Sequence, residues 1–160
     1  MENVIYEHLN WFTDFDPKVS FPIKIWEGKN KPYGGLWGSR VDATKGWRYY
    51  LNEIEKDNIT ETCTSFRFKL KPNAILRIIT SYKDYLELPK MYDPDTGEEC
   101  VDYVQCFNDG IDAIELRSLG DEYEEYYDEE TIEEFDEVFC SHWQCDSIVV
   151  INPDAYEIIE

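Results

Sequence analysis

The sequence predicts one domain of the α+β class. Its 160 residues are 42% hydrophobic and 16% aromatic, which is enough apolar material to form a buried core. About seven segments have the apolar pattern of strands, and three or four have the spacing of short helices. This combination of many strands with few, short helices favours the α+β class.

Two strands are expected near the N-terminus. The segment "NVIYE" (3–7) alternates apolar and polar residues, as a strand with one buried face does, and "FPIKIW" (21–26) repeats the pattern.

The stretch "KPYGGLWGSR" (31–40) is predicted to be a bend. Gly34 and Gly35 permit a positive φ angle or a close approach to the backbone. Two interpretations are open: a tight turn held in place by Trp37, or a loop in which Ser39 and its neighbours contact a ligand.

A helix is expected after this bend, in "KGWRYYLNEIEK" (45–56). Trp47, Tyr50, Leu51 and Ile54 are separated by three, four and seven residues, which places them on one face of an amphipathic helix.

Two more strands, joined by a short connection, and a second helix follow. "TSFRFKLK" (64–71) alternates strictly, and "NAILRIIT" (73–80) comes after a Pro-Asn turn. A short helix begins with Ser81 as its N-cap and Asp84 in its first turn, and it stops near Pro89.

The last third of the chain supplies a turn, a helix and three strands. "DPDTGEE" (93–99) resembles a calcium loop, but its glycine and its last glutamate stand at the wrong offsets, so a solvated turn is expected. A helix is predicted over 101–110, ending at "NDG", and a strand over 111–116. The segment "DSIVVINPDAYEII" (146–159) predicts a buried strand, a turn and a final edge strand.

The charge of the chain is strongly negative and unevenly distributed. The formal net charge is −20, no Lys or Arg follows Arg117, and 15 of the 35 acidic residues lie in 118–160. Residues 121–137 contain 11 acids and no base, so we expect an exposed acidic insertion at about 117–140 within a single domain of residues 1–160. This field repels phosphate backbones and disfavours nucleic-acid binding. It serves either solubility alone or attraction to a basic protein surface.

Several other classes of protein are disfavoured. The N-terminus lacks the pattern of a signal peptide, and no apolar run approaches the ~20 residues of a membrane span, so a soluble, cytoplasmic protein is expected. The cysteines are odd in number and more typical of reduced thiols than of disulfides: Cys63, Cys100, Cys106, Cys140 and Cys145.

Familiar catalytic and metal motifs are also missing. "CSHWQC" (140–145) does not have the cysteine spacing of structural zinc sites, so no metal is expected. No serine elbow and no common phosphate loop occurs. The two histidines are His8 and His142, and a lone histidine more often has a structural role than a chemical one.

The order of several motifs resembles a known family. "KPYGGLWGSR", "GWRYYLNE", "NDGIDAIEL" and "CDSIVVINPDAYEI" look like the motifs of a family of small bacterial and phage proteins, which is itself similar to the ADP-ribosyltransferase-like fold. The resemblance covers most of the chain outside residues 117–140 and implies a split pair of antiparallel sheets that clamps NAD.

The resemblance also implies roles for individual residues. Residues expected to contact NAD are His8, Gly35, Leu36, Trp37, Ser39, Trp47 and Tyr50. Related enzymes place a glutamate at the start of the penultimate strand, where this chain has Asp146; Glu115 on the preceding strand is the other candidate for the catalytic acid. Such an acid stabilises the ribosyl cation that forms as nicotinamide leaves.

Two functions follow from these patterns. The first is NAD-dependent mono-ADP-ribosyl transfer to a protein target, as in a phage-encoded counter-defence factor. The second is a non-catalytic acidic inhibitor that mimics nucleic acid and occupies a basic protein surface through residues 121–137. The shorter side chain of Asp146 leaves the enzymatic activity open, because a displacement of about 1 Å can cost on the order of a hundredfold in rate.

Overall fold

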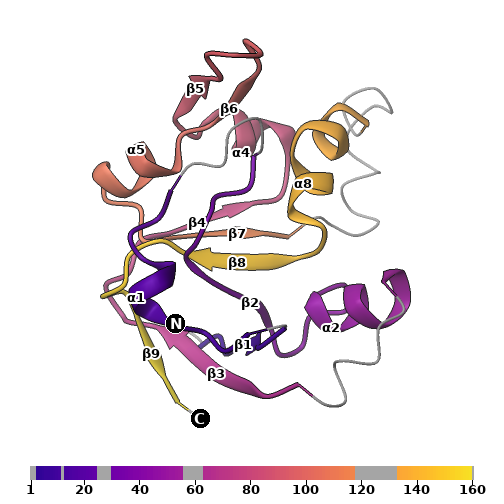
Figure 1. The fold of residues 1–160 in the computed structure, drawn as a ribbon, viewed down its shortest axis with the longest axis vertical. Coiled ribbons are helices and arrows are strands. Elements are labelled where there is room, and N and C mark those ends of the chain that lie inside the picture. Colours follow the sequence, from indigo (N-terminus) through magenta and orange to yellow (C-terminus); the bar gives the residue numbers. More distant parts are fainter. Residues whose placement is uncertain (1–2, 12, 25–29, 56–62, 118–132, 160) are drawn as a thin grey trace.

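A computed structural model describes residues 3–11, 13–24, 30–55, 63–117 and 133–159, and Figure 1 shows their arrangement. The elements in chain order are β1 (Tyr6–Leu9), α1 (Pro17–Ser20), β2 (Leu36–Arg40), α2 (Trp47–Tyr49), the π-helix η1 (Tyr50–Ile54), β3 (Ser65–Leu70), β4 (Leu76–Ile79), α4 (Tyr82–Leu86), β5 (Lys90–Tyr92), β6 (Glu99–Val101), α5 (Tyr103–Asn108), β7 (Ala113–Leu116), the π-helix η2 (Asp136–Cys140), α8 (Ser141–Trp143), β8 (Ser147–Val150) and β9 (Tyr156–Ile158).

Seven of these strands form one mixed sheet, in the order β4-β7-β8-β2-β1-β3-β9. Neighbouring strands are antiparallel except β4 and β7, which are parallel. The α+β class is therefore confirmed. The expectation of a split pair of antiparallel sheets is wrong in two respects, because the seven strands form one sheet and its β4–β7 edge is parallel. The chain between β4 and β7 carries α4, the β5–β6 hairpin and α5, which is long enough to cross over and return in the same direction.

The stretch predicted to be a bend contains a central strand. Leu36–Arg40 forms β2, which pairs with β8 on one side and with β1 on the other. Its sequence does not look like a strand, because it lacks β-branched residues and has a glycine at its centre. Position 38 requires glycine for a steric reason, because a Cβ atom there would lie 2.8 Å from Cε1 of Phe68.

The turn itself lies immediately before β2 and is formed as predicted. Gly34 and Gly35 have φ angles of +89° and +79°, in the region that glycine adopts most easily. The Gly35 N–H donates to the carbonyl of Ser20 at 2.7 Å. A Cβ on Gly35 would lie 2.9 Å from the Val150 carbonyl oxygen, so the turn also brings two backbones close together.

Most of the other predicted elements are confirmed. The strands expected within 64–71, 73–80 and 111–116 are β3, β4 and β7, and the segment 146–159 contains the buried β8 and the edge strand β9. Ser81 caps α4 by accepting from the Asp84 N–H at 3.2 Å, and α5 falls within 101–110. The helix expected over 45–56 begins at Trp47 as α2 and continues as η1.

Three local predictions differ from the structure. The first strand lies at Tyr6–Leu9 rather than at 3–7. In the expected strand 21–26, Lys24 makes only an isolated bridge to Tyr33, and residues 25–26 lie outside the described part. The β5–β6 hairpin was not expected, because its strands are short and flank the "DPDTGEE" turn.

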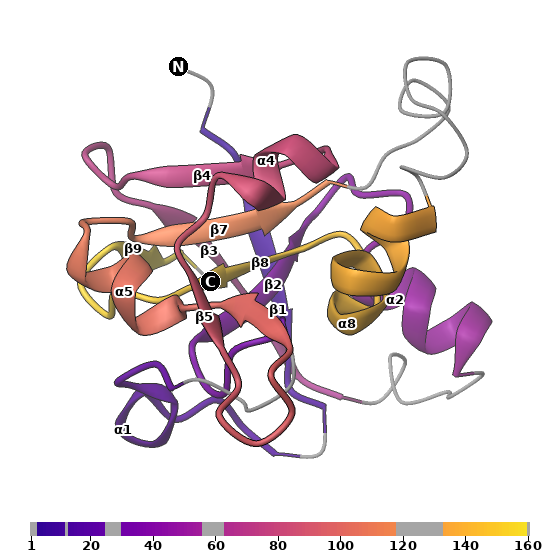
Figure 2. The same ribbon diagram turned by 90° about the horizontal axis from the view of Figure 1, so that it is seen from above.

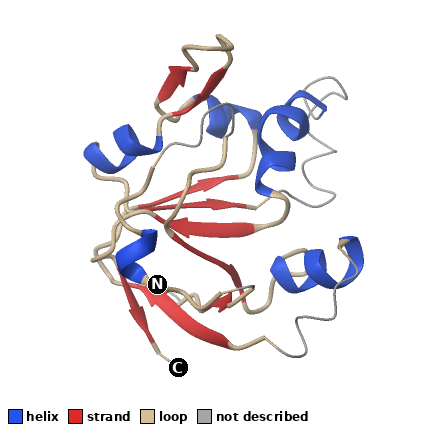
Figure 3. Cartoon of the chain, viewed as in Figure 1, coloured by secondary structure: helices blue, strands red, loops and turns tan. Residues whose placement is uncertain are grey.

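The sheet has a core on each of its faces. The core on the helical side includes Tyr103, Phe139 and Trp143, and the other core includes Tyr6 and Phe68. Figures 2 and 3 show α4, α5 and α8 gathered around the β4–β7–β8 half of the sheet, with α2 beside the β1–β2 half. Among the described residues, no helix is long and apolar enough to cross a membrane.

Most of the predicted acidic insertion lies outside the described residues, which resume at Glu133. Glu133 and Glu134 are exposed, and the chain then enters η2. Phe135 and Phe139 are buried in the helical-side core, so this end of the segment belongs to the domain.

Candidate functional site

The sheet divides between β1 and β2. These strands pair through only two residue pairs, Tyr6 with Arg40 and Glu7 with Ser39. The rest of β1 pairs only with β3, and the first half of β2 pairs only with β8. Figure 1 shows β2 passing from the side of β8 to the side of β1. The strands thus separate on the side where β1 ends and β2 begins.

A pocket lies at this division, and we call it the tryptophan pocket. Its volume is about 260 Å³. The lining residues come from β1, β2, α2, η1 and the segments next to them: His8, Leu9, Trp11, Lys31, Trp37, Trp47 and Leu51.

Two indole rings and one ammonium group shape this pocket. The rings of Trp37 and Trp47 are 6.4 Å apart and nearly perpendicular, at 85°. The Lys31 Nζ lies 4.9 Å from the Trp37 centroid and 5.1 Å from the Trp47 centroid. Trp37 donates from its Nε1 to the Gly34 carbonyl at 2.9 Å, whereas the buried Nε1 of Trp47 has no hydrogen-bond acceptor among the described residues. The glycine turn therefore holds one wall of the pocket in place.

Lys31 is the cation of the tryptophan pocket. Its Nζ donates to Oε1 of Gln144 at 2.7 Å. Burial lowers the pKa of Lys31, because removing the ammonium group from water disfavours its charged form. Gln144 in turn donates to the Tyr50 hydroxyl at 3.1 Å, so Tyr50 stands behind the lysine rather than in the lining.

His8 closes the divided end of the sheet. Its Nδ1 lies 2.6 Å from the Trp37 carbonyl oxygen, which can only accept, so Nδ1 carries the proton. Burial is the main cause that lowers the pKa of His8, and the neutral ring leaves Nε2 as an acceptor. The ring also packs 5.0 Å from that of Phe66 and 5.5 Å from that of Phe15. A neutral, fixed imidazole therefore forms part of the wall.

A second pocket adjoins the first, and we call it the arginine pocket. Its volume is about 230 Å³, and it shares Leu9 and Trp47 with the tryptophan pocket. Its polar lining comes from Glu7, Ser39, Arg40, Arg48 and Arg67. Positive side chains thus lie beside the aromatic rings.

Two ion pairs organise the arginine pocket. Arg48 donates to both carboxylate oxygens of Glu7, at 2.6 and 3.0 Å. Arg40 donates to both oxygens of Glu115, at 2.8 and 2.9 Å. Arg67 is exposed on the neighbouring strand β3.

The Ser39 hydroxyl group connects β2 to the start of α2 and to the chain just before β8. The hydroxyl donates to the Asp146 carbonyl at 2.8 Å and accepts from the Trp47 N–H at 3.0 Å. The helix α2 begins at Trp47 without a capping side chain of its own, so Ser39 satisfies one of its free N–H groups from a distance. Ser39 therefore sets the position of Trp47.

The two predicted catalytic acids do not line either pocket. Glu115 is only 2% exposed and accepts from Arg40 and from the Tyr6 hydroxyl, the latter at 3.1 Å, in a buried cluster. Asp146 lies just before β8, where its N–H donates to the Lys45 carbonyl and its own carbonyl accepts from Ser39. The acid that does line the arginine pocket is Glu7.

The predicted NAD-contacting residues are only partly brought together. His8, Trp37 and Trp47 line the tryptophan pocket, and Ser39 lines the arginine pocket. Three others lie outside both linings: Gly35 in the turn, Leu36 in the core and Tyr50 behind Lys31.

Sequence reasoning missed several residues of the site. Lys31 begins the glycine-rich stretch, but nothing near it in the sequence indicates the two indoles above it. Glu7 and Arg48 lie 41 residues apart, and only the packing of α2 against β1 brings them together. Trp11, three residues after His8, was the one signal close to a predicted residue.

The cysteines form no metal centre in the part of the chain that the structure describes, where no group of three potential ligands is found. All five are free thiols. Burial raises the pKa of Cys106 to about 12 and raises those of Cys140 and Cys145 further, so these thiols are poor nucleophiles.

No family model, curated protein or solved structure matches this chain.

Proposed function

We propose that this chain binds an adenine dinucleotide, with NAD as the first candidate, across the tryptophan and arginine pockets. The observation that carries the proposal is that the two pockets adjoin through Leu9 and Trp47. The first offers aromatic walls for a ring. The second offers the exposed guanidinium of Arg67 for a phosphate, beside Arg40 and Arg48, which already bind Glu115 and Glu7. A base stacked on an aromatic side chain gains about 1–3 kcal/mol, and guanidinium groups match phosphate oxygens in geometry.

The volumes of the two pockets favour a ligand of two parts, one in each pocket. Volumes of about 260 and 230 Å³ are each below the roughly 300–1,000 Å³ of pockets that hold drug-sized molecules. Each pocket therefore suits one part of a dinucleotide. The buried N–H of Trp47, which has no acceptor among the described residues, gives a further reason to expect a polar ligand atom nearby.

The charge of Lys31 favours the adenine ring over the nicotinamide ring in the tryptophan pocket. The lysine ammonium already lies over both indoles. The oxidised nicotinamide ring is also positive, and two cations within one small pocket repel each other. Adenine is neutral and has no such penalty, and Lys31 can then bind the adjoining phosphate.

The division between β1 and β2, with His8 beside it, supports the resemblance to the ADP-ribosyltransferase-like fold. Binding is better supported than transfer, because Asp146 and Glu115 line neither pocket. A carboxylate must lie beside the ribosyl cation to stabilise it. Glu7, held by Arg48 in the arginine pocket, is therefore the acid to test for transfer.

A basic protein partner is common to both predicted functions, whether it is modified or only occupied. The formal charge of −20 supports such a partner. The inhibitory alternative depends on residues 121–137, of which 121–132 lie outside the described part. It predicts salt-sensitive binding to a basic partner, and deletion of the segment without any loss of binding would contradict it.

Calorimetry tests the nucleotide proposal directly. We expect NAD and ADP-ribose to bind with similar affinity and nicotinamide mononucleotide to bind more weakly, because the latter lacks adenine. Trp47→Ala should abolish binding, and the control Tyr49→Ala should not, since Tyr49 is an exposed aromatic residue of the same helix outside both pockets. Absence of binding at millimolar NAD and ADP-ribose would refute the proposal. Incubation with labelled NAD and cell lysate, with Glu7→Gln beside the unmodified protein, tests transfer separately.

A further inference from the structure

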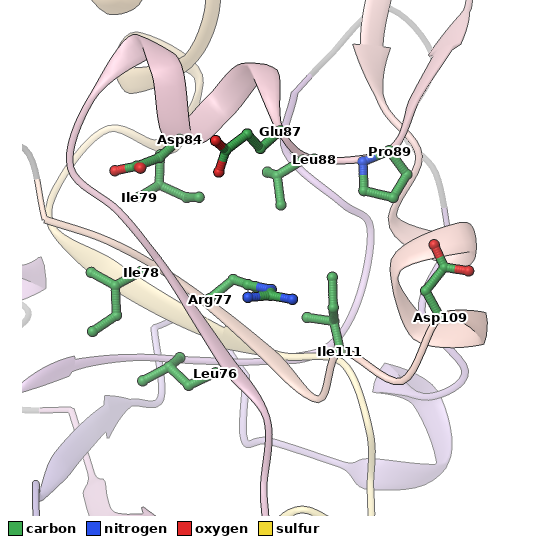
Figure 4. A pocket seen from close by; sticks show the side chains of 10 residues that line it. All are labelled: Leu76, Arg77, Ile78, Ile79, Asp84, Glu87, Leu88, Pro89, Asp109 and Ile111. Carbon is green, nitrogen blue, oxygen red and sulfur yellow. The ribbon is translucent and has the colours of Figure 1, made fainter.

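A groove lies along β4, the strand at one edge of the sheet. Its volume is about 580 Å³, and it is bounded by β4, α4 and the chain after α5 (Figure 4). Arg77 extends into it from β4, with Glu87 on one wall and Asp109 on another. None of these residues lines the tryptophan or arginine pocket, so the groove is separate from the proposed nucleotide site.

The backbone of β4 has one side that no described strand covers. The Ile75 carbonyl accepts from the Ala113 N–H of β7 at 3.2 Å, and the Ile79 carbonyl accepts from the N–H of Arg117, the residue after β7, at 3.0 Å. In a parallel pair, alternate residues face the neighbouring strand, so the N–H and C=O groups of Leu76 and Ile78 point away from β7. This outer edge ends at Thr80, whose N–H donates to Asp84 at 2.9 Å.

The exposed edge is also apolar. Ile75 is 48% exposed and Ile78 is 41% exposed. An exposed edge strand with apolar side chains is a template for pairing with another extended chain. Ile78 and Leu76 lie on one face of β4, whereas Arg77 and the buried Ile79 lie on the face toward α4.

The walls of the groove decide which kind of chain fits. Three carboxylates, of Asp84, Glu87 and Asp109, outnumber the single guanidinium of Arg77. A second copy of this protein, which carries a charge of −20, would bring the same acidic walls together, and like charges repel. A basic segment has the complementary charge.

We infer that β4 binds an extended, basic segment of a partner protein as an additional strand of the sheet. The backbone of the segment pairs with Leu76 and Ile78. Its long basic side chains on one face reach Glu87 and Asp109, and its apolar side chains on the other face cover Ile78. The strand supplies affinity for extended backbone in general, and the acidic walls supply the preference for Lys and Arg.

A labelled peptide tests the charge preference. The probe is a nine-residue peptide of alternating valine and lysine, followed by fluorescence anisotropy, with a valine–glutamate peptide as its counterpart. We expect the lysine peptide alone to bind and the double variant Glu87→Lys, Asp109→Lys to weaken binding about tenfold more than a control. The control, Glu53→Lys with Glu137→Lys, changes the net charge equally at exposed positions outside the groove. Equal weakening by both double variants would overturn the proposal.

Amide hydrogen exchange tests whether the peptide adds to the sheet as a strand, and it requires no mutation in β4. Binding of the lysine peptide should slow exchange of the Leu76 and Ile78 amides, which point outward, and leave that of Arg77 unchanged, since Arg77 already faces β7. Unchanged exchange at Ile78 on saturation would contradict strand addition. Sedimentation of the protein alone should show a monomer, and dimers that protect Ile78 would assign the edge to a second copy instead.

Discussion

The ammonium group of Lys31 lies 4.9 Å from the centroid of the Trp37 ring. The same group lies 5.1 Å from the Trp47 centroid and donates to Gln144. An aromatic face attracts a cation through its quadrupole, and the attraction grows when water is excluded. Lys31 thus places one positive charge beside the two indole rings, and under the proposed function we expect it to favour ligands that carry an anionic group.

Replacement of Lys31 by methionine should distinguish the contribution of the phosphate to the binding affinity from that of the adenine ring. Lys31→Met keeps most of the alkyl chain and removes the charge, so we expect affinity for ADP-ribose to fall about tenfold, the value of one charge-assisted hydrogen bond. Affinity for neutral adenosine should change little. Lys83→Met, an exposed residue of α4, is the control. Calorimetry measures both, and an unchanged affinity of Lys31→Met for ADP-ribose would place the phosphate elsewhere.

The buried His8 should make the folded protein less stable in weak acid. Its pKa is lowered from 6.5, so below pH 6.5 the unfolded state takes up a proton that the folded state does not. The free energy of unfolding should fall as the pH drops through 6.5, and this contribution should level off below the folded-state pKa. His8→Gln removes the titration and should lose less stability between pH 7.5 and 5. Urea denaturation measures the difference, and parallel curves for the two proteins would argue against a buried neutral imidazole.

Loss of the Ser39 hydroxyl should loosen the start of α2. Ser39→Ala leaves the Asp146 carbonyl and the Trp47 N–H without this partner, and such a loss costs about 1–3 kcal/mol. Ser141→Ala removes an exposed hydroxyl that bonds to the Glu137 carbonyl at 3.1 Å and should cost far less. Chemical denaturation compares the two, and equal costs would show that Ser39 has no special role.

Glu115 should prove structural rather than catalytic. Removing one partner of a buried ion pair costs about 3–5 kcal/mol, and the partial exposure of Arg40 places Glu115→Gln near the lower end. Glu157→Gln breaks an exposed pair with Lys69 and should cost at most about 1 kcal/mol. If the folded Glu115→Gln protein lost NAD binding or a transfer activity beyond its loss of stability, the residue would have a direct role.

The turn glycines should differ in how they tolerate alanine. At Gly110, φ is +89° and a Cβ would meet nothing within 4 Å, so Gly110→Ala should cost only the conformational penalty of about 1–2 kcal/mol. At Gly35 the same penalty is joined by contacts of 2.6 Å to Val149 and 2.9 Å to Val150, so the cost should be at least about 1 kcal/mol larger. Thermal or urea unfolding ranks the variants, and the reverse order would mean that the turn can shift.

Helices and strands whose formation depends on residues nearby in the sequence were predicted well. The strict alternation of 64–71 gave β3, the apolar run at 147–151 gave β8, and the Ser81 cap gave α4. Strand alternation and helix capping act over a few residues, so they can be read from the chain. The central strand β2 was missed because its form depends on β1 and β8 on either side and on the Phe68 ring against Gly38.

The candidate site was likewise predicted only in part. His8, Trp37 and Trp47 were expected together from the resemblance, and they line one pocket. Glu115 was expected beside them, but its alternation on β7 points it toward Arg40 and Tyr6 instead. The alternation of side chains along one strand does not show which residues of other strands a given side chain will contact.

The sequence by itself determined the α+β class, the glycine turn, most of the strands and the acidic charge, because composition and local spacing carry that information. Only the tertiary structure decided that Lys31 lies over two indoles, that Glu7 rather than Asp146 lines a pocket, and that β4 is an edge. These relationships join residues far apart in the chain, and the packing that creates them depends on the shapes of all the intervening elements at once.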